Sequence, residues 1–199
     1  MAFIIFLLLL CFQNALSFGK GQKDFYSFSV KNIKGEEVAL EIFRGQVSLV
    51  INVASECGYT DSHYRALKRL YDILSFNKKF NILAFPCNQF GGQEPSEDDQ
   101  IEEFALNEYG VEFPLFSKIE VIGENADPAF KNLIEQSKLQ PDWNFYKYLV
   151  SHDGVVINAW DTKTSVEDIF PDIERAVKVA ESVSTDPVQE QSSVPREDL

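Results

Sequence analysis

The hydrophobic pattern predicts a βαβ unit near the start of the domain. Residues Val47–Ala54 are nearly continuously apolar and β-branched, which is typical of a strand buried on both faces of a sheet. Apolar residues then recur at helical spacing from Tyr64 to Leu74, and Phe80–Phe85 has the pattern of a second buried strand. Because a crossover of this kind is right-handed and returns in the same direction, the two strands are expected to be parallel.

The rest of the chain predicts two hairpins and three more helices around this unit. An N-terminal β-hairpin is expected first, with a turn at Asn32–Gly35. The last helix is expected to begin with a capping box at either Thr164-x-x-Glu167 or Ser165-x-x-Asp168. The order predicts an α/β protein with a thioredoxin-like fold, an N-terminal β-hairpin and an inserted helix. The remaining predicted elements are strands at Phe25–Val30, Val38–Phe43, Tyr146–Val150 and Val155–Trp160, and helices at Glu97–Glu108, Asp127–Lys138 and Ser165–Ser182.

Both ends of the chain resemble targeting segments. Residues 1–17 contain an apolar run of signal-peptide length and end in Ala15-Leu16-Ser17, a small-x-small cleavage pattern. An uncleaved anchor is the alternative, because neither Lys nor Arg precedes the run. Residues 184–199 are predicted to form a flexible tail whose REDL ending is similar to a retention signal. We therefore expect a domain at 18–183, located in the endoplasmic-reticulum lumen or secreted, without stable membrane insertion after cleavage.

Composition and charge narrow the possible partners. The 199 residues are 45% hydrophobic and 25% charged, which is typical of one globular domain and excludes a disordered chain. The formal net charge is −13. Because phosphate backbones and anionic lipids are also negative, we expect neither nucleic acid nor a polybasic membrane interaction.

Cysteine and histidine usage argues against a disulfide framework and against a metal site. Signal cleavage leaves only Cys57 and Cys87, so the pair is either one structural bridge or a redox pair. His63 and His152 are interpreted as surface residues, and the four side chains lack a usual ligand spacing. We therefore expect no metal.

Cys57 is the candidate reactive residue. It follows a buried strand and precedes a helix, where the helix dipole and free N–H groups favour an anion such as a thiolate. The run Cys57-Gly58-Tyr59-Thr60 lacks the second thiol of a C-x-x-C exchange site. A lone thiolate suits reduction of a peroxide through a sulfenic acid, which another thiol must then reduce.

Three blocks of the chain resemble the signature blocks of the glutathione peroxidases, in the form with cysteine at the reactive position. The resemblance extends from about Phe25 to Val177 and implies a peroxidase. The blocks are NVASECGYT at Asn52–Thr60, FPCNQFGGQEP at Phe85–Pro95 and WNFYKYLV at Trp143–Val150.

The resemblance also implies roles for individual residues. Cys57 matches the position that reacts with peroxide, and Gln93, Trp143 and Asn144 match the three residues that complete the family's tetrad. Amide and indole N–H groups can hydrogen-bond a thiolate and a departing oxygen without adding charge. Gly91 and Gly92 are expected to form the turn that directs Gln93 inward.

The role of Cys87 stays open at this stage. It follows the second parallel strand and so lies at the same end of the sheet as Cys57. A bridge requires Cα atoms within roughly 7 Å and suitable Cβ directions. Cys87 is therefore either a resolving thiol for Cys57 or a buried structural residue.

The reductant is expected to be glutathione or a dithiol protein of the protein-disulfide-isomerase type, with no bound cofactor. Arg65, Lys68 and Lys147 are scattered rather than clustered, which favours the protein dithiol. We expect a monomer that acts in the response to oxidative stress and in oxidative folding. The alternative is a non-catalytic thioredoxin-like adaptor or chaperone of the secretory pathway.

Overall fold

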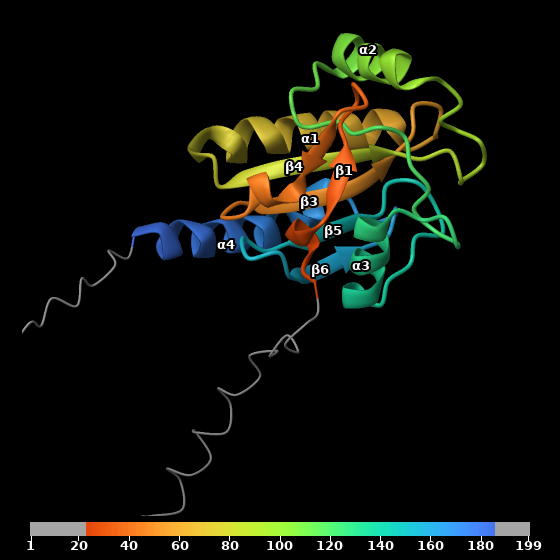
Figure 1. The fold of residues 1–199 in the computed structure, drawn as a ribbon. Helices are drawn as coiled ribbons and strands as arrows, with labels where there is room; N and C mark the ends of the chain where they lie inside the picture. Colours follow the sequence, from red (N-terminus) through yellow and green to blue (C-terminus); the bar gives the residue numbers. More distant parts are fainter. Residues whose placement is uncertain (1–22, 186–199) are drawn as a thin grey trace, which may run out of the picture.

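The computed structural model describes residues 23–185, which form a four-stranded mixed sheet, a separate two-stranded hairpin and four α-helices (Figure 1). The elements in chain order are η1 (Phe25–Ser27), β1 (Ser29–Lys31), β2 (Glu37–Ala39), η2 (Leu40–Phe43), β3 (Val47–Val53), α1 (Thr60–Leu74), η3 (Ser75–Asn77), β4 (Phe80–Pro86), α2 (Asp98–Tyr109), α3 (Pro128–Ser137), β5 (Lys147–Val150), β6 (Val156–Trp160) and α4 (Val166–Thr185). The order of the large sheet is β4-β3-β5-β6. As predicted, β3 and β4 are parallel, whereas β5 pairs antiparallel with both β3 and β6.

The sheet has a hydrophobic core on each face, which explains the continuous apolar pattern of β3. Leu49 and Ile51 point into a cluster with α1 and α4, and Val50 points into a second cluster with α3. All seven residues of β3 are buried. A strand buried on both faces shows no alternation, and the two polar residues of β3, Ser48 and Asn52, are both hydrogen-bonded.

The N-terminal hairpin is confirmed but is shorter than predicted. Strands β1 and β2 have three residues each, and the expected strand ends are the 3₁₀ turns η1 and η2. Phe25 and Tyr26, adjacent in η1, are both fully buried. The hydroxyl of Tyr26 donates to the carbonyl oxygen of Gln46 (2.7 Å) and lies 2.9 Å from that of Ser48.

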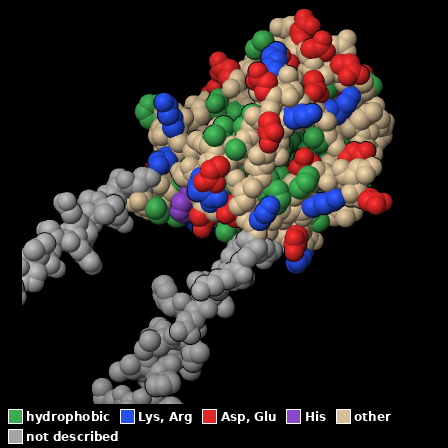
Figure 2. Space-filling view, in the orientation of Figure 1, with side chains coloured by type: hydrophobic (Ala, Val, Ile, Leu, Met, Phe, Trp, Pro, Cys, Tyr) green, Lys and Arg blue, Asp and Glu red, His purple; other side chains and the backbone are tan. Residues whose placement is uncertain are grey.

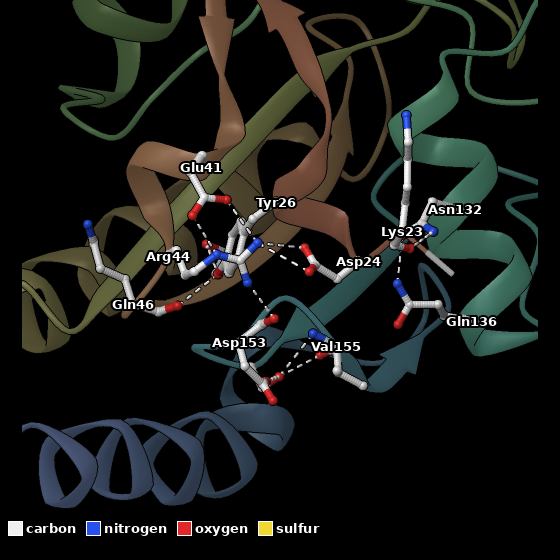
Figure 3. Close-up of polar contacts among 12 residues, drawn as sticks. Lys23, Asp24, Tyr26, Glu41, Arg44, Gln46, Asn132, Gln136, Asp153 and Val155 are labelled. Carbon is white, nitrogen blue, oxygen red and sulfur yellow. Dashed lines mark hydrogen bonds and ion pairs between the residues drawn. The ribbon is translucent and has the colours of Figure 1, made fainter. Parts of the chain in front are cut away.

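Arg44 joins the N-terminal segment to the β5–β6 turn (Figure 3). Its guanidinium donates to the Asp24 carboxylate at 3.0 Å, to the Glu41 carboxylate at 2.7 Å and to the carbonyl oxygen of Asp153 at 2.8 Å. The backbone N–H of Phe25 donates to the carbonyl oxygen of Gly154 at 2.9 Å. These contacts hold the N-terminal segment against the β5–β6 turn.

The helix boundaries follow from capping. Glu97 and Gln100 form the capping box of α2, and Asp127 caps α3 by accepting from the backbone N–H of Ala129 at 2.8 Å. For α4 the structure decides between the two predicted boxes, because the Ser165 hydroxyl accepts from the backbone N–H of Asp168 at 3.1 Å.

The surface is acidic but mixed. On the face shown in Figure 2, acidic and basic side chains are interspersed, with acidic side chains gathered over α2 at the top. The predicted signal peptide at 1–17 lies outside the described residues, as does most of the predicted tail at 184–199. Within residues 23–185, no helix is long and apolar enough to cross a membrane.

Candidate active site

Cys57 lies in the tight loop between β3 and α1, three residues before the helix begins. Its side chain is only 7% exposed. The hydroxyl of Thr60 accepts from the backbone N–H of Cys57 at 3.1 Å and donates to the carbonyl oxygen of Ala54 at 2.7 Å. Thr60, which stands where a C-x-x-C protein has its second thiol, thus fixes the shape of the loop that presents Cys57.

Gln93 and Asn144 meet beside this loop, although they are 51 residues apart in the chain. The Asn144 Nδ2 donates to Gln93 Oε1 at 3.0 Å, and the backbone N–H of Glu56 donates to the carbonyl oxygen of Gln93 at 3.0 Å. The first bond uses the acceptor end of the Gln93 amide and leaves its donor end for a ligand. Asn144 is fully buried, and its Oδ1 has no partner among the described residues.

Trp143 lies near Gln93 and lines a surface pocket. Its side chain is 38% exposed, and its Cη2 would be 3.5 Å from a Cβ added at Gly91. The same added Cβ would be 3.4 Å from the side chain of Gln93. Gly91 has a φ of +70°, so this turn both needs glycine and brings Gln93 and Trp143 together.

Asn52 holds the Trp143–Tyr146 segment in place, a role that the sequence reading missed. Its Nδ2 donates to the carbonyl oxygen of Trp143 at 3.1 Å, and its Oδ1 accepts from the backbone N–H of Tyr146 at 2.9 Å. Phe145, between them, has a φ of +66°, unusual for a non-glycine residue. The available signal was an amide side chain inside the mostly apolar run ending at Ala54, in which Ser48 is the other polar residue.

Glu94 is a second residue that the sequence reading missed. It is fully buried, and its Oε1 accepts from the hydroxyl of Ser55, two residues before Cys57, at 2.7 Å. Its Oε2 has no partner among the described residues, and the same holds for the buried hydroxyl of Tyr64. Burial raises the pKa of the Glu94 carboxyl to about 7. A titratable group thus connects the loop of Gln93 to the loop of Cys57.

Cys87 lies at the same end of the sheet as Cys57 but in the other core cluster. It is fully buried and packs with Phe85 and α3, whereas Cys57 belongs to the cluster of α1 and α4. Its Sγ lies 3.6 Å from the Oε1 of Gln89, and burial raises the pKa of its thiol. Both thiols are free.

The interpretation of His63 as a surface residue is wrong. Its ring is buried and stacks on Phe145 at a centroid distance of 4.8 Å, and its Nε2 lies 3.3 Å from the Nζ of Lys147. Burial and the neighbouring Lys147 lower the pKa of His63 to about 4. Lys147, which the sequence placed among scattered basic residues, is also fully buried. His152 is partly buried beside the β5–β6 turn.

A pocket of about 260 Å³ opens beside Trp143 and is lined by Tyr59, Asp142, Asp161 and Lys163 among others. A larger pocket of about 520 Å³ lies between β6 and α4 and includes none of the candidate residues. Within the described part of the chain, no group of three His, Cys, Asp or Glu side chains is arranged to hold a metal ion.

Comparison with solved structures defines the class of protein. The structure of T. cruzi GPX1 matches with a TM-score of 0.63 and 30% identity, over 78% of this chain and 97% of that one. Thioredoxin-family structures share the fold at lower identity. The predicted thioredoxin-like fold is therefore confirmed, and the Cys57 loop of this chain is hydrogen-bonded through Glu56 to the backbone of Gln93.

Sequence comparison then gives the family. The family model "Glutathione peroxidase" matches residues 25–134. "Glutathione peroxidase 7" of Bos taurus is 57% identical over 79% of this chain and 84% of its own length. "Probable glutathione peroxidase 8" of Mus musculus is 46% identical over 77% of this chain and 73% of its own length. The chain belongs to the glutathione peroxidase family and is a peroxidase of the thiol type.

Proposed function

We propose that Cys57 reduces hydrogen peroxide or an organic hydroperoxide by direct attack of its thiolate. The sulfur bonds to one peroxide oxygen, the O–O bond breaks, and the other oxygen leaves as water or an alcohol after taking up a proton. Cys57 is thereby oxidised by two electrons to a sulfenic acid. The observation that carries this proposal is the Asn144–Gln93 hydrogen bond beside the Cys57 loop, because it directs uncharged donors to the place where negative charge moves.

The other site residues have distinct roles in this proposal. Gln93 offers its amide N–H groups and Trp143 its indole N–H to the thiolate and the departing oxygen. Asn144 orients Gln93, and its unpartnered Oδ1 is available to accept from a peroxide O–H. Asn52 and Thr60 keep the two backbone segments in position.

We propose that the reductant's thiol then attacks the Cys57 sulfenic acid directly, releasing water and forming a mixed disulfide. A second thiol of the reductant attacks the reductant's own sulfur in this mixed disulfide. Cys57 leaves as a thiolate, and the reductant is released as a disulfide. The alternative, a Cys57–Cys87 disulfide, requires Cys87 to leave the buried cluster on the opposite face. Its raised pKa also disfavours the thiolate that this attack needs.

The charge around the pocket beside Trp143 supports a protein dithiol rather than glutathione. Asp142 and Asp161 contribute two carboxylates to this pocket, against the single ammonium of Lys163. Glutathione is itself a net anion at neutral pH, so this lining disfavours it. A C-x-x-C oxidoreductase of the protein-disulfide-isomerase type needs no carboxylate-binding pocket.

We propose that the protein acts as a monomer in the endoplasmic-reticulum lumen, or after secretion, in the response to oxidative stress and in oxidative folding. The support is the apolar leader and the REDL ending, both outside the described residues. Deleting REDL from the full chain is expected to shift it from the cell to the medium. If the protein is retained in the cell without REDL, the result would contradict the proposed retention signal.

The chemistry is tested by mass spectrometry after addition of an equimolar amount of hydrogen peroxide and a sulfenate-trapping reagent. We expect a trapped sulfenate at Cys57 in the wild type and in Cys87→Ser, and none in Cys57→Ser. An internal disulfide in the wild type alone would make Cys87 the resolving thiol. Absence of any reaction at Cys57 would overturn the proposal.

The reductant is tested by adding glutathione or a C-x-x-C oxidoreductase to the oxidised protein at equal thiol concentration. We expect the dithiol protein to restore the Cys57 thiol about tenfold faster, because the acidic pocket repels glutathione. Equal rates, or a faster rate with glutathione, would contradict the proposed preference.

A further inference from the structure

Lys147 is a buried cation that the chemistry described so far does not use. It is fully buried, and within residues 23–185 it makes no ion pair with a carboxylate. Its Nζ donates to the carbonyl oxygen of Phe145 at 2.8 Å and lies 3.3 Å from the Nε2 of His63. A buried ammonium without a carboxylate partner costs stability, so packing alone does not account for lysine at this position.

The contacts of Lys147 join the two backbone segments that carry the site. The Phe145 carbonyl belongs to the segment of Trp143 and Asn144, which has a left-handed φ at Phe145. The ring of His63 reaches the other segment, because its Nδ1 lies 3.1 Å from the carbonyl oxygen of Tyr59, two residues after Cys57.

The protonation states along this chain of contacts are mutually consistent. With the proton on Nδ1, neutral His63 donates to Tyr59 and accepts from Lys147 at Nε2. Its lowered pKa of about 4 keeps the ring neutral at physiological pH. The other charged groups that act on the pair are Asp161, after β6, and Glu167 of α4, and both favour the charged forms.

Lys147 and Cys57 lie on the same face of the sheet. Lys147 pairs in register with Ile51 of β3, whose side chain belongs to the core cluster that includes Cys57 and Phe145. Below its pKa, the ammonium therefore places a positive charge on the face of the sheet whose core cluster includes Cys57. Low-dielectric surroundings strengthen its effect compared with a surface lysine.

We propose that Lys147 is a positioning residue of the peroxidase reaction, which orients the Trp143–Phe145 segment directly and the Cys57 loop through neutral His63. This inference rests on the proposed chemistry at Cys57. Loss of the ammonium should loosen both segments at once and lower the rate of the peroxide step.

The test compares Lys147→Met with a matched control, Lys131→Met. Methionine has a similar length, and the control also loses a lysine that donates to a backbone carbonyl, that of Glu124 at 2.6 Å, but on α3. The measurement is the rate constant of Cys57 oxidation by hydrogen peroxide from pH 6 to pH 9.5, together with thermal unfolding. We expect Lys147→Met to react about tenfold more slowly without a lower melting temperature, and Lys131→Met to match the wild type.

The pH profile provides a readout that a merely structural role would not change. Burial lowers the pKa of Lys147 to about 8, so the wild-type rate should decline as pH rises through that value. Lys147→Met should lack this decline. If Lys147→Met does not fold, His63→Phe, which keeps a ring on Phe145 but removes Nε2, should lower the rate several-fold.

Either of two results would overturn the inference: a wild-type rate constant in Lys147→Met, or in His63→Phe if the first variant does not fold, or a wild-type profile without an alkaline decline. A wild type that does not react at Cys57 would instead overturn the proposed function itself.

Discussion

Cys57 and Cys87 lie at the same end of one sheet and have nearly opposite surroundings. Cys57 is held by a backbone loop that Thr60 closes, and polar groups from two other segments converge beside it. Cys87 continues the β4 alternation of Leu83 and Phe85 into the core that α3 covers. There Phe85 stacks on a neighbouring ring, with a centroid distance of 4.4 Å.

We propose from this difference that the reactivity of each thiol depends on the face of the sheet on which it lies, rather than on the end of the sheet. The face of α1 and α4 contains the buried titratable groups His63 and Lys147, and the Cys57 loop on the same side contacts Glu94. The face of α3 surrounds its cysteine with aromatic and aliphatic side chains. A thiol in such apolar surroundings is disfavoured as a thiolate and contributes to packing.

The largest expected effect separates the two cysteines. Cys57→Ser should reduce the peroxide reaction by at least about a thousandfold, because an unactivated hydroxyl is a poor nucleophile. Cys87→Ser should keep the rate of the peroxide step within about twofold, but lose about 1–3 kcal/mol of unfolding free energy by burying a hydroxyl. Stopped-flow kinetics and urea unfolding measure the two quantities. A Cys87→Ser variant that cannot react with peroxide would contradict the comparison.

Asn52→Leu should affect both rate and stability. It removes the two hydrogen bonds that hold the Trp143–Tyr146 segment and leaves the buried N–H of Tyr146 unpaired, at a cost of about 2–4 kcal/mol. Displacing that segment should also slow peroxide reduction at least about tenfold. The control is Asn132→Leu, which removes a buried asparagine of α3 that donates to the carbonyl oxygen of Lys23. It should lose stability but keep the peroxide rate, and equal rate losses in both variants would contradict the prediction.

Glu94→Gln should change the pH dependence of stability. The folded pKa of Glu94 is raised from 4.5 to about 7, so its contribution is present below pH 4.5 and is lost as pH rises through 7. Between pH 4.5 and pH 8, the unfolding free energy of Glu94→Gln relative to wild type should therefore increase by about 1–3 kcal/mol. Urea unfolding at both pH values measures this, and parallel profiles would show that Glu94 does not titrate as described.

His63→Phe should change the pH dependence of stability less than Glu94→Gln does, and in the acid rather than the neutral range. The folded pKa of His63 is lowered from 6.5 to about 4, so its contribution is present above pH 6.5 and is lost as pH falls through 4. As pH falls from 7 to 4, the unfolding free energy of His63→Phe should therefore decrease by about 1–2 kcal/mol less than that of the wild type. The same unfolding series measures this. A wild-type acid slope in the variant would contradict the buried, neutral state of His63.

Much of the architecture was predictable from the sequence because local patterns encode it. The apolar run at Val47–Ala54, the helical spacing after Tyr64 and the capping signals place β3, α1 and the later helices within a few residues. The hairpin strands were predicted too long, because the segments Phe25–Ser27 and Leu40–Phe43 form 3₁₀ turns whose apolar residues resemble a strand in sequence. The candidate residues Gln93, Trp143 and Asn144 came from motif resemblance, since no local pattern indicates that an amide in a loop faces a thiol.

The sequence by itself determined that one cysteine lies between a buried strand and a helix, without a C-x-x-C partner. Only the tertiary structure decided which groups surround it and which face holds Cys87. Asn52, Glu94 and Lys147 become part of the site through contacts across 39 to 94 residues of chain, such as Ser55 with Glu94 and Asn52 with Tyr146. The physical reason is that burial and pairing set the state of a polar group, and both depend on how separate strands and loops pack together.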